Sequence, residues 1–166
     1  KILKKLNENE LIVTIVGLGY VGLPLALLFG KKLNTFGLDT SQVKIDNLKL
    51  NIDTNKQCEK QNFVKSKFIN FTFNYEVVKK SDVIIICLPT PINKSKKPDL
   101  KILKKATKEI AQNMNKNAII IYESTVYPGL IEEVCVPILE NKSNLIWKKN
   151  FYLGYSPERV NPNDKL

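Results

Sequence analysis

The chain has 166 residues with 26 basic and 16 acidic side chains, a formal net charge of +10, 43% hydrophobic residues and no histidine. This length suits one globular domain with a core of its own, the apolar runs are too short to span a membrane, and imidazole catalysis and histidine-ligated metal are excluded within the chain. The lysines are spread along the whole length in ones and twos with no aromatic-basic signature, so codon bias accounts for the charge and we expect no nucleic-acid partner.

Apolar residues follow two periods along the chain. Short β-branched runs such as "LIVTIV" and "DVIIICL" indicate buried strands, and apolar residues three and four apart indicate helices. In chain order the expected elements are a strand at 11–16, a helix at 23–33, a strand at 35–39, a helix at 41–50 capped by Ser41, a loop with room for a short helix at 51–66, a strand at 69–73, a short helix at 74–81, a strand at 82–88, a helix at 99–114 capped by Asp99, a strand at 117–122, a helical stretch at 128–141 interrupted at Pro137, and a strand at 150–155. This alternation predicts an α/β fold with a doubly wound, mostly parallel sheet and helices on both faces. We expect an N-terminal extension at 1–10, with no hydrophobic leader, and one domain at 11–166.

A glycine-rich loop, "GLGYVG", joins the first predicted strand to the first predicted helix. In a Rossmann-like fold Gly17 makes the tight turn, Gly19 lets a pyrophosphate approach the backbone, and Gly22 lets the helix pack close to the strand. The helix N-terminus adds free N–H groups and a partial positive charge. The predicted cofactor-binding residues of the loop are Gly17, Leu18, Gly19, Tyr20, Val21 and Gly22.

An acidic residue, Asp39, ends the second predicted strand. A carboxylate at this place accepts hydrogen bonds from the adenosine ribose hydroxyls and repels a 2′-phosphate, which favours NAD over NADP. Alternatively, the glycines only shape a turn and Asp39 caps a helix. The strand context, the spacing and the acid together favour the NAD site.

Three further segments follow predicted strands and are rich in hydroxyls, prolines and charges: "LPTP" at 88–91, "ESTVYPG" at 123–129 and "YSPERVNP" at 155–162. Because the carboxyl ends of parallel strands share one edge, where ligands bind, we expect these segments to converge beside the glycine loop. Taken singly, each also has an ordinary interpretation as a turn or a surface ion pair.

The side chains of these segments suit a cofactor and an anionic substrate. Two prolines stiffen the backbone around Thr90 and would hold it near the cofactor ribose. Arg159, the one arginine of the chain, suits bidentate contact with phosphate or carboxylate, which lysine reproduces poorly. Hydroxyls of Ser124 and Thr125 can donate to a cofactor or a water, and Glu158 can relay a proton. The candidate residues of the three segments are Pro89, Thr90, Ser124, Thr125, Glu158 and Arg159.

Five ordered motifs, "GLGYVGLPLA", "LPTPI", "PDL", "ESTVYPG" and "YSPERVNP", resemble the N-terminal NAD-binding domain of the UDP-glucose/GDP-mannose (nucleotide-sugar) 6-dehydrogenase family over nearly the whole chain. The wording of the last two is similar to that of bacterial enzymes that oxidise UDP-N-acetylhexosamines, of the GlcNAc or GalNAc type, for capsule or O-antigen synthesis. A UDP-glucose 6-dehydrogenase ranks second. The resemblance implies a four-electron oxidation at sugar C6, with two NAD⁺ and a cysteine thioester, to a uronic acid.

Residue roles follow from the same resemblance. It implies that Lys44 lies near the adenosine, that Thr90 and Thr125 contact the cofactor, and that Glu158 assists thioester hydrolysis. Thr125 is also implied to lie near the reacting centre. The implied catalytic residues are therefore Thr125 and Glu158, and the implied substrate contacts are Glu158, Arg159, Val160 and Asn161.

The chain departs from the family pattern in two respects. Asn163 stands where many relatives have glycine, although asparagine also tolerates left-handed backbone. None of Cys58, Cys87 and Cys135 matches the nucleophile's motif, and Cys87, inside an apolar run, is expected to be a packed core thiol. We expect the nucleophilic cysteine, the catalytic lysine and the UDP-binding domain beyond residue 166.

The fragment alone is therefore expected to be inactive. The resemblance implies a UDP-sugar substrate and a homodimer for the full-length protein, while the fragment alone is a candidate monomer. The short apolar runs predict no membrane partner. Three cysteines without a C-x-x-C pair indicate a reducing cytoplasm, not a disulfide framework. A non-catalytic NAD-sensing module remains the alternative from a different functional class.

Overall fold

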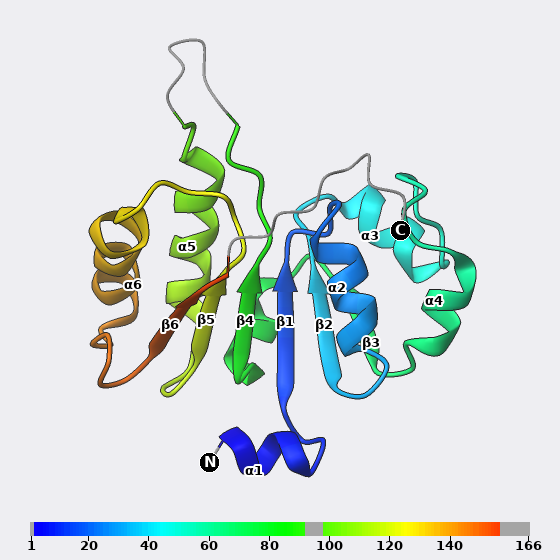
Figure 1. Cartoon of the computed structure of the whole chain (residues 1–166), viewed down its shortest axis with the longest axis horizontal. Coiled ribbons are helices and arrows are strands. Elements are labelled where there is room, and N and C mark those ends of the chain that lie inside the picture. The colour runs from blue at the N-terminus through cyan, green and yellow to red at the C-terminus, as the bar shows by residue number, and fades with distance from the viewer. Residues whose placement is uncertain (1, 92–97, 157–166) are drawn as a thin grey trace.

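A six-stranded parallel sheet forms the centre of the molecule (Figure 1). The structure is a computed structural model that describes residues 2–91 and 98–156. The strands are β1 (Ile12–Val16), β2 (Asn34–Leu38), β3 (Ile69–Thr72), β4 (Val83–Ile86), β5 (Ile119–Tyr122) and β6 (Tyr152–Tyr155). Their order is β3-β2-β1-β4-β5-β6, with every pairing parallel, so the direction of strand succession reverses between β1 and β4. The predicted doubly wound fold is confirmed, and its switch point lies where the glycine loop leaves β1.

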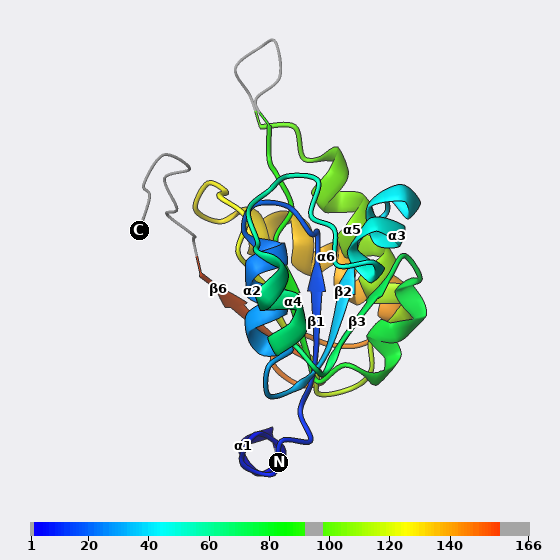
Figure 2. The ribbon, with the colours of Figure 1, turned by 90° about the vertical axis from the view of Figure 1, so that its right-hand side faces the viewer.

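Helices cover both faces of this sheet. The helical elements are α1 (Ile2–Asn7), α2 (Gly22–Phe29), α3 (Gln42–Lys49), α4 (Lys60–Lys65), the 3₁₀ helix η1 (Tyr75–Lys80), α5 (Lys101–Asn113), the π-helical turn η2 (Ile131–Cys135) and α6 (Val136–Ser143). Seen edge-on, α2 and α4 lie on one face and α5 and α6 on the other (Figure 2). The short helix α1 lies beyond the amino end of β1, where Lys5 Nζ donates to Asp82 Oδ1 at 2.6 Å.

The predicted helix starts and ends need some correction. Ser41 does cap α3, since its Oγ accepts a hydrogen bond from the Lys44 backbone N–H. Asp99 also accepts a backbone N–H, from Lys101 at 3.0 Å, but α5 begins after Leu100 and not at Asp99. Because the aspartate forms a turn just outside the helix, it orders the approach to α5 and not its first turn.

Two helices change course at particular residues. α2 ends at Phe29, before the predicted residue 33, with Gly30 as its C-cap. Gly30 packs closely against β3, since a Cβ added there would lie 2.9 Å from Ile69 Cβ. Pro137 lies in the first turn of α6, where its missing N–H is tolerated. The predicted interruption of the helical stretch lies before Pro137, where the π-helical turn η2 ends and α6 begins.

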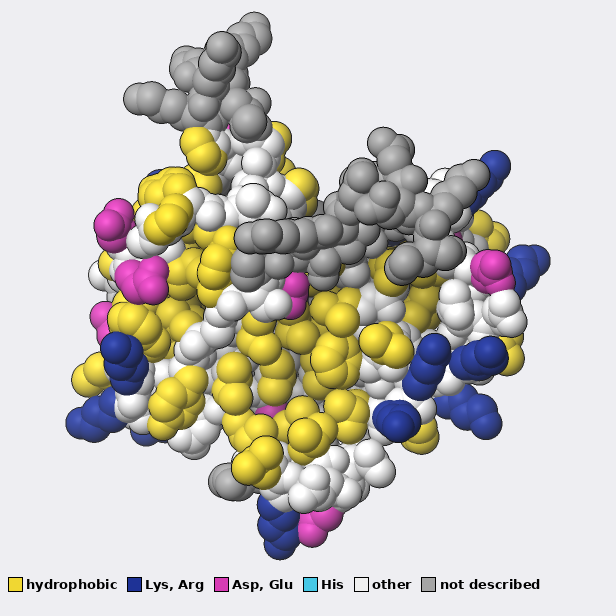
Figure 3. Space-filling view, viewed as in Figure 1, with side chains coloured by type: hydrophobic (Ala, Val, Ile, Leu, Met, Phe, Trp, Pro, Cys, Tyr) yellow, Lys and Arg dark blue, Asp and Glu magenta, His cyan; other side chains and the backbone are white. Residues whose placement is uncertain are grey.

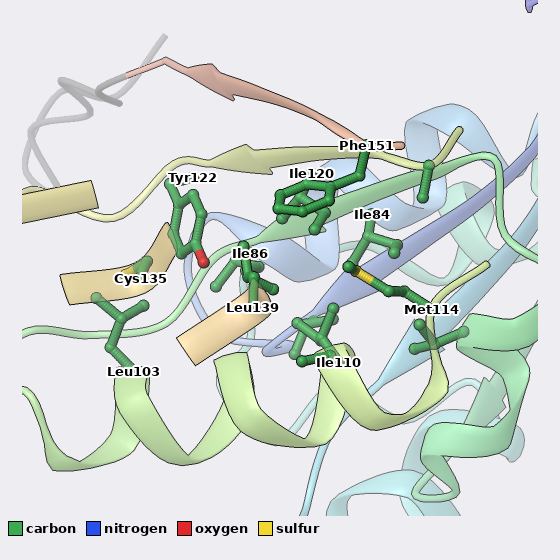
Figure 4. Packing of buried hydrophobic residues seen from close by; sticks show 14 of the residues in the cluster. Ile84, Ile86, Leu103, Ile110, Met114, Ile120, Tyr122, Cys135, Leu139 and Phe151 are labelled. Carbon is green, nitrogen blue, oxygen red and sulfur yellow. The ribbon is translucent and has the colours of Figure 1, made fainter. Parts of the chain in front are cut away.

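Apolar side chains form a core on each face of the sheet. On the face of α5 and α6, Leu103, Ile110 and Leu139 pack around isoleucines of β4 and β5 (Figure 4). Tyr122 is fully buried there, with its hydroxyl 3.2 Å from Thr107 Oγ1, so its polar group is satisfied. The core residues of the opposite face are Leu11, Val13, Ile15, Leu18, Leu23, Ala26, Leu27, Leu33, Ile45, Leu48, Phe63, Phe71 and Ile85. All three cysteines are free thiols, as expected.

Over β4–β6 the face that carries α2 has no helix across it in the described ranges (Figure 1). Val83, Ile119 and Tyr152 form one register row across these strands, and Tyr152 is 46% exposed. Figure 3 shows hydrophobic side chains gathered over this part of the sheet. None of the helices within residues 2–91 and 98–156 is long and apolar enough to cross a bilayer.

Candidate functional site

The glycine loop is held in place by close packing at its two ends. Gly17 has φ +92°, and its N–H donates to the Leu38 carbonyl at 2.8 Å. A Cβ added to Gly17 would lie 2.8 Å from the Cys87 carbonyl oxygen, and one added to Gly22 would lie 1.8 Å from the Gly17 carbonyl oxygen. Since backbone atoms cannot give way as side chains do, only glycine fits at both positions.

The middle of the loop is open. No heavy atom lies within 4 Å of a Cβ built on Gly19, so the backbone here faces free space. The next turn starts α2, with the Leu23 N–H donating to the Gly19 carbonyl at 3.1 Å. Tyr20, beside Gly19, is 66% exposed. A helix N-terminus behind an unobstructed glycine is an arrangement that binds phosphate.

Asp39 accepts three hydrogen bonds at the end of β2. Its Oδ2 accepts from the Leu18 N–H at 3.0 Å and from Lys44 Nζ at 2.6 Å, and its Oδ1 accepts from the Ser41 N–H at 3.0 Å. Burial by itself would raise the pKa of Asp39, but the Lys44 ammonium and the two backbone donors outweigh it, and the pKa lies below its ordinary value. Asp39 is therefore a carboxylate that fixes the glycine loop to the start of α3. Lys44, which the sequence placed near the adenosine, lies against this carboxylate.

A cavity of about 450 Å³ opens on the β2 side of the glycine loop, and we call it the β2-side pocket. Apolar side chains form its walls, and charged groups stand among them. Its lining residues are Val16, Gly17, Leu38, Asp39, Thr40, Tyr75, Leu88, Ile102, Lys105, Ala106 and Glu109. Only Gly17 and Asp39 of this set were predicted. Tyr75 comes from η1, and four others come from one face of α5, which carries no motif.

A second cavity, of about 350 Å³, opens on the other side of the loop, and we call it the β5-side pocket. It brings together the glycine loop and the segments after β4 and β5, which lie far apart in the sequence. Its lining residues are Gly19, Tyr20, Val21, Cys87, Leu88, Pro89, Thr90, Glu123, Ser124 and Thr125. The expected convergence of "LPTP" and "ESTVYPG" beside the glycine loop is confirmed. Leu88 lines both pockets.

The hydroxyls of the β5-side pocket bind the two loops to each other. Thr90 Oγ1 donates to the Thr125 carbonyl at 2.6 Å, and Ser124 Oγ donates to the Leu88 carbonyl at 2.7 Å. Their protons are thus engaged within the protein, and their oxygens remain as acceptors. The sequence identified these residues but could not show which carbonyls they contact.

Part of the predicted site lies outside the described residues. This holds for Glu158, Arg159, Val160 and Asn161, and for Asn163. Within the described ranges no group of histidine, cysteine, aspartate and glutamate side chains has the arrangement of a metal site. Cys87, predicted to be a core thiol, is half-buried against the core and also lines the β5-side pocket.

Residues 11–166 match the NAD binding domain of the UDP-glucose/GDP-mannose dehydrogenase family. The chain belongs to this family. Its cofactor is accordingly NAD, as predicted from the glycine loop and Asp39. Family membership also confirms the resemblance drawn from the five ordered motifs.

Curated members of the family are similar over nearly the whole chain. Protein CapL of Staphylococcus aureus is 50% identical over 162 residues, and the UDP-N-acetyl-D-glucosamine 6-dehydrogenase of Pseudomonas aeruginosa is 47% identical over 157 residues. These matches cover 97% and 95% of this chain but 37% of each relative. The chain therefore spans little more than a third of the length of these relatives.

Solved structures of family members have the same fold. The UDP-D-ManNAc dehydrogenase of Pyrococcus horikoshii matches with a TM-score of 0.81 and 31% identity over 92% of this chain and 37% of its own. A ternary complex of GDP-mannose dehydrogenase from Pseudomonas aeruginosa matches with a TM-score of 0.83 and 26% identity over 90% of this chain and 36% of its own.

The residues present fit NAD. The unobstructed Gly19 in front of α2 leaves room for a pyrophosphate, and Asp39, which lines the β2-side pocket, is a carboxylate of the kind that accepts ribose hydroxyls. The two pockets flank the loop, as the two nucleosides of a dinucleotide require.

Proposed function

We propose that this chain is the NAD-binding part of an enzyme that oxidises C6 of a UDP-N-acetylhexosamine to a uronic acid, for capsule or O-antigen synthesis. The observation that carries the proposal is the pair of pockets that meet at Leu88 beside the open Gly19. The substrate class is supported by the 47% identity to a UDP-N-acetyl-D-glucosamine 6-dehydrogenase.

The reaction removes two hydride equivalents from one carbon. The C6 alcohol, two NAD⁺ and one water give a carboxylate, two NADH and three protons; the water supplies the second carboxylate oxygen. NAD accepts the hydrides. A cysteine thiol that adds to the C6 aldehyde would give a thiohemiacetal, and loss of the second hydride and a proton would leave a thioester. Hydrolysis of the thioester would release the acid and the thiol. We place this cysteine outside the present chain.

Each part of the site has a role in this proposal. The glycine loop holds the pyrophosphate, and Asp39 holds the adenosine ribose, with Lys44 fixing the carboxylate. Thr90 and Thr125 face the nicotinamide half, where their oxygens accept hydrogen bonds. We assign thioester hydrolysis to Glu158 and substrate phosphate or carboxylate contact to the segment from Arg159 to Asn161.

The decisive experiment is an assay of the full-length enzyme with a panel of UDP-sugars and with NAD⁺ or NADP⁺. We expect two NADH for each UDP-N-acetylhexosamine consumed, with UDP-glucose a poor substrate. Preference for UDP-glucose would identify the second candidate, a UDP-glucose 6-dehydrogenase. NAD⁺ binding without turnover of any sugar would instead indicate the sensing module.

Assembly and compartment belong to the same proposal. We propose a homodimer for the full-length enzyme and a cytoplasmic site of action, since three free thiols suit a reducing compartment. Sedimentation of the full-length enzyme tests the first.

A further inference from the structure

Glu109 is a charged side chain with no assigned role on the wall of the β2-side pocket. It lies in α5, one turn after Lys105, and Ile102 and Ala106 of the same helix also line the pocket. Residues spaced three and four apart on a helix share a face, so this face of α5 is turned towards β2. No sequence motif lies on this face of α5.

The carboxylate of Glu109 has unused hydrogen-bonding capacity. Among the described residues it forms no ion pair and accepts no side-chain or backbone hydrogen bond, although Lys105 stands one turn away. Asp39, on the same pocket, already accepts three bonds. A carboxylate without a hydrogen-bond partner on the wall of a largely apolar pocket favours a ligand that brings a donor.

Tyr75 also lines this pocket and lies within the electrostatic range of both of its acidic groups. Burial, followed by the negative charges of Glu109 and Asp39, raises the pKa of Tyr75 to about 12. Its phenol is therefore neutral at physiological pH and has a single proton to donate. That proton cannot satisfy both carboxylates, and Glu109 keeps acceptor sites for a ligand.

The geometry points to Glu109 as the residue that reads the base of the dinucleotide: we propose that its carboxylate accepts a hydrogen bond from the exocyclic amino group of adenine. This inference rests on the proposed use of the β2-side pocket for the adenosine half of NAD. The walls formed by Val16, Leu38 and Ile102 suit a flat purine ring. Adenine carries a donor at its 6-position, and a base with a carbonyl oxygen there would turn an acceptor towards the carboxylate.

The hypoxanthine analogue of NAD⁺ (deamino-NAD⁺) tests this assignment, because it replaces only that amino group with a carbonyl. Hypoxanthine keeps a donor at N1, one atom along the same edge, so the loss is expected to be partial. We expect the full-length enzyme to bind NAD⁺ about tenfold more tightly than deamino-NAD⁺, measured by isothermal titration calorimetry without substrate. Glu109→Gln offers both an acceptor and a donor, and should bring the ratio of the two dissociation constants to within about twofold of unity.

Glu132→Gln is the matched control, since Glu132 is an exposed glutamate of η2 outside both pockets. It should leave the wild-type ratio unchanged. Equal affinity of the wild-type enzyme for the two nucleotides, or an unchanged ratio in Glu109→Gln, would overturn the inference while NAD⁺ binding itself stands. Failure of the wild-type enzyme to bind either nucleotide would overturn the proposed function instead.

Discussion

The two pockets on either side of Leu88 are built from different parts of the fold. The β2-side pocket is lined by the ends of β1 and β2 and by a regular helix, and Asp39 is its most connected group. The β5-side pocket is lined largely by loops, which hydroxyl groups hold together. Strand ends and helices are fixed by the core, whereas loops depend on a few local bonds. Under the proposed function, the rigid pocket would recognise the adenosine and the loop-built pocket would adapt to the reacting half of the cofactor.

The largest expected effect concerns the loop between the pockets. Gly22→Ala places a methyl group 1.8 Å from the Gly17 carbonyl oxygen, so we expect the free energy of unfolding to fall by ~3 kcal/mol or more. The methyl group of Gly19→Ala meets no atom within 4 Å, so the free energy of unfolding should stay within ~0.5 kcal/mol of wild type. The same methyl group would occupy the space proposed for the pyrophosphate, so NAD⁺ should bind about tenfold more weakly. Denaturant unfolding and calorimetry separate the two effects. Equal destabilisation by both variants would contradict the packing argument.

Asp39→Asn tests the rigid pocket with an intermediate effect. We expect NAD⁺ to bind about tenfold more weakly and NADP⁺ to be less affected, because the lost charge also repels a 2′-phosphate. The Lys44 ammonium, 2.6 Å away, offsets part of this repulsion, so the change in preference is modest. Ser41→Ala removes the cap of α3 and should cost ~1 kcal/mol of stability without changing the preference. An equal loss for both nucleotides would remove Asp39 from its ribose role.

Asp39→Asn should also change how the free energy of unfolding depends on pH. The pKa of folded Asp39 lies below its ordinary value of 3.8, so the stability it contributes is complete above that pH and is lost as the pH falls through the lowered value. Asparagine does not titrate, and the variant should lose less stability between pH 5 and pH 3 than wild type, by chemical denaturation at each pH.

The smallest effects are expected in the loop-built pocket. Ser124→Ala leaves the part-buried Leu88 carbonyl without its donor, at a cost of ~1 kcal/mol, and Thr90→Val removes an exposed hydrogen bond at a cost of ~0.5 kcal/mol. Both substitutions should weaken NAD⁺ binding, because each removes a hydrogen bond between the loop after β4 and the loop after β5. Ser143→Ala, which removes a hydroxyl bond within α6, should leave NAD⁺ affinity unchanged. If it lowers affinity as much as the others, the effect is one of global stability.

Sequence periodicity predicted the sheet because its strands are short apolar runs between clear helices. The glycine motif and its spacing to the acid identified Gly17, Gly22 and Asp39. Each of these positions has a local requirement: close backbone contact at the two glycines, and a carboxylate at the end of the strand. Glu109 and Tyr75 were missed, because their place in the pocket depends on how α5 and η1 pack and not on neighbouring residues. The partners of Ser124 and Thr90 were also beyond prediction, since a hydroxyl accepts many geometries.

The order of the strands has a consequence for how the protein folds. β1 pairs with β4 as well as with β2, and β4 reaches it only after the chain has passed through β3 at the far edge of the sheet. Such non-local pairing slows folding, because loops must close before any contact rewards them. Gly17 receives its backbone neighbour Cys87 only at that late step. A nascent chain in which β4 has not yet paired with β1 therefore lacks both pockets, because Leu88 lines each of them, and retention on an immobilised nucleotide would report completed folding during synthesis.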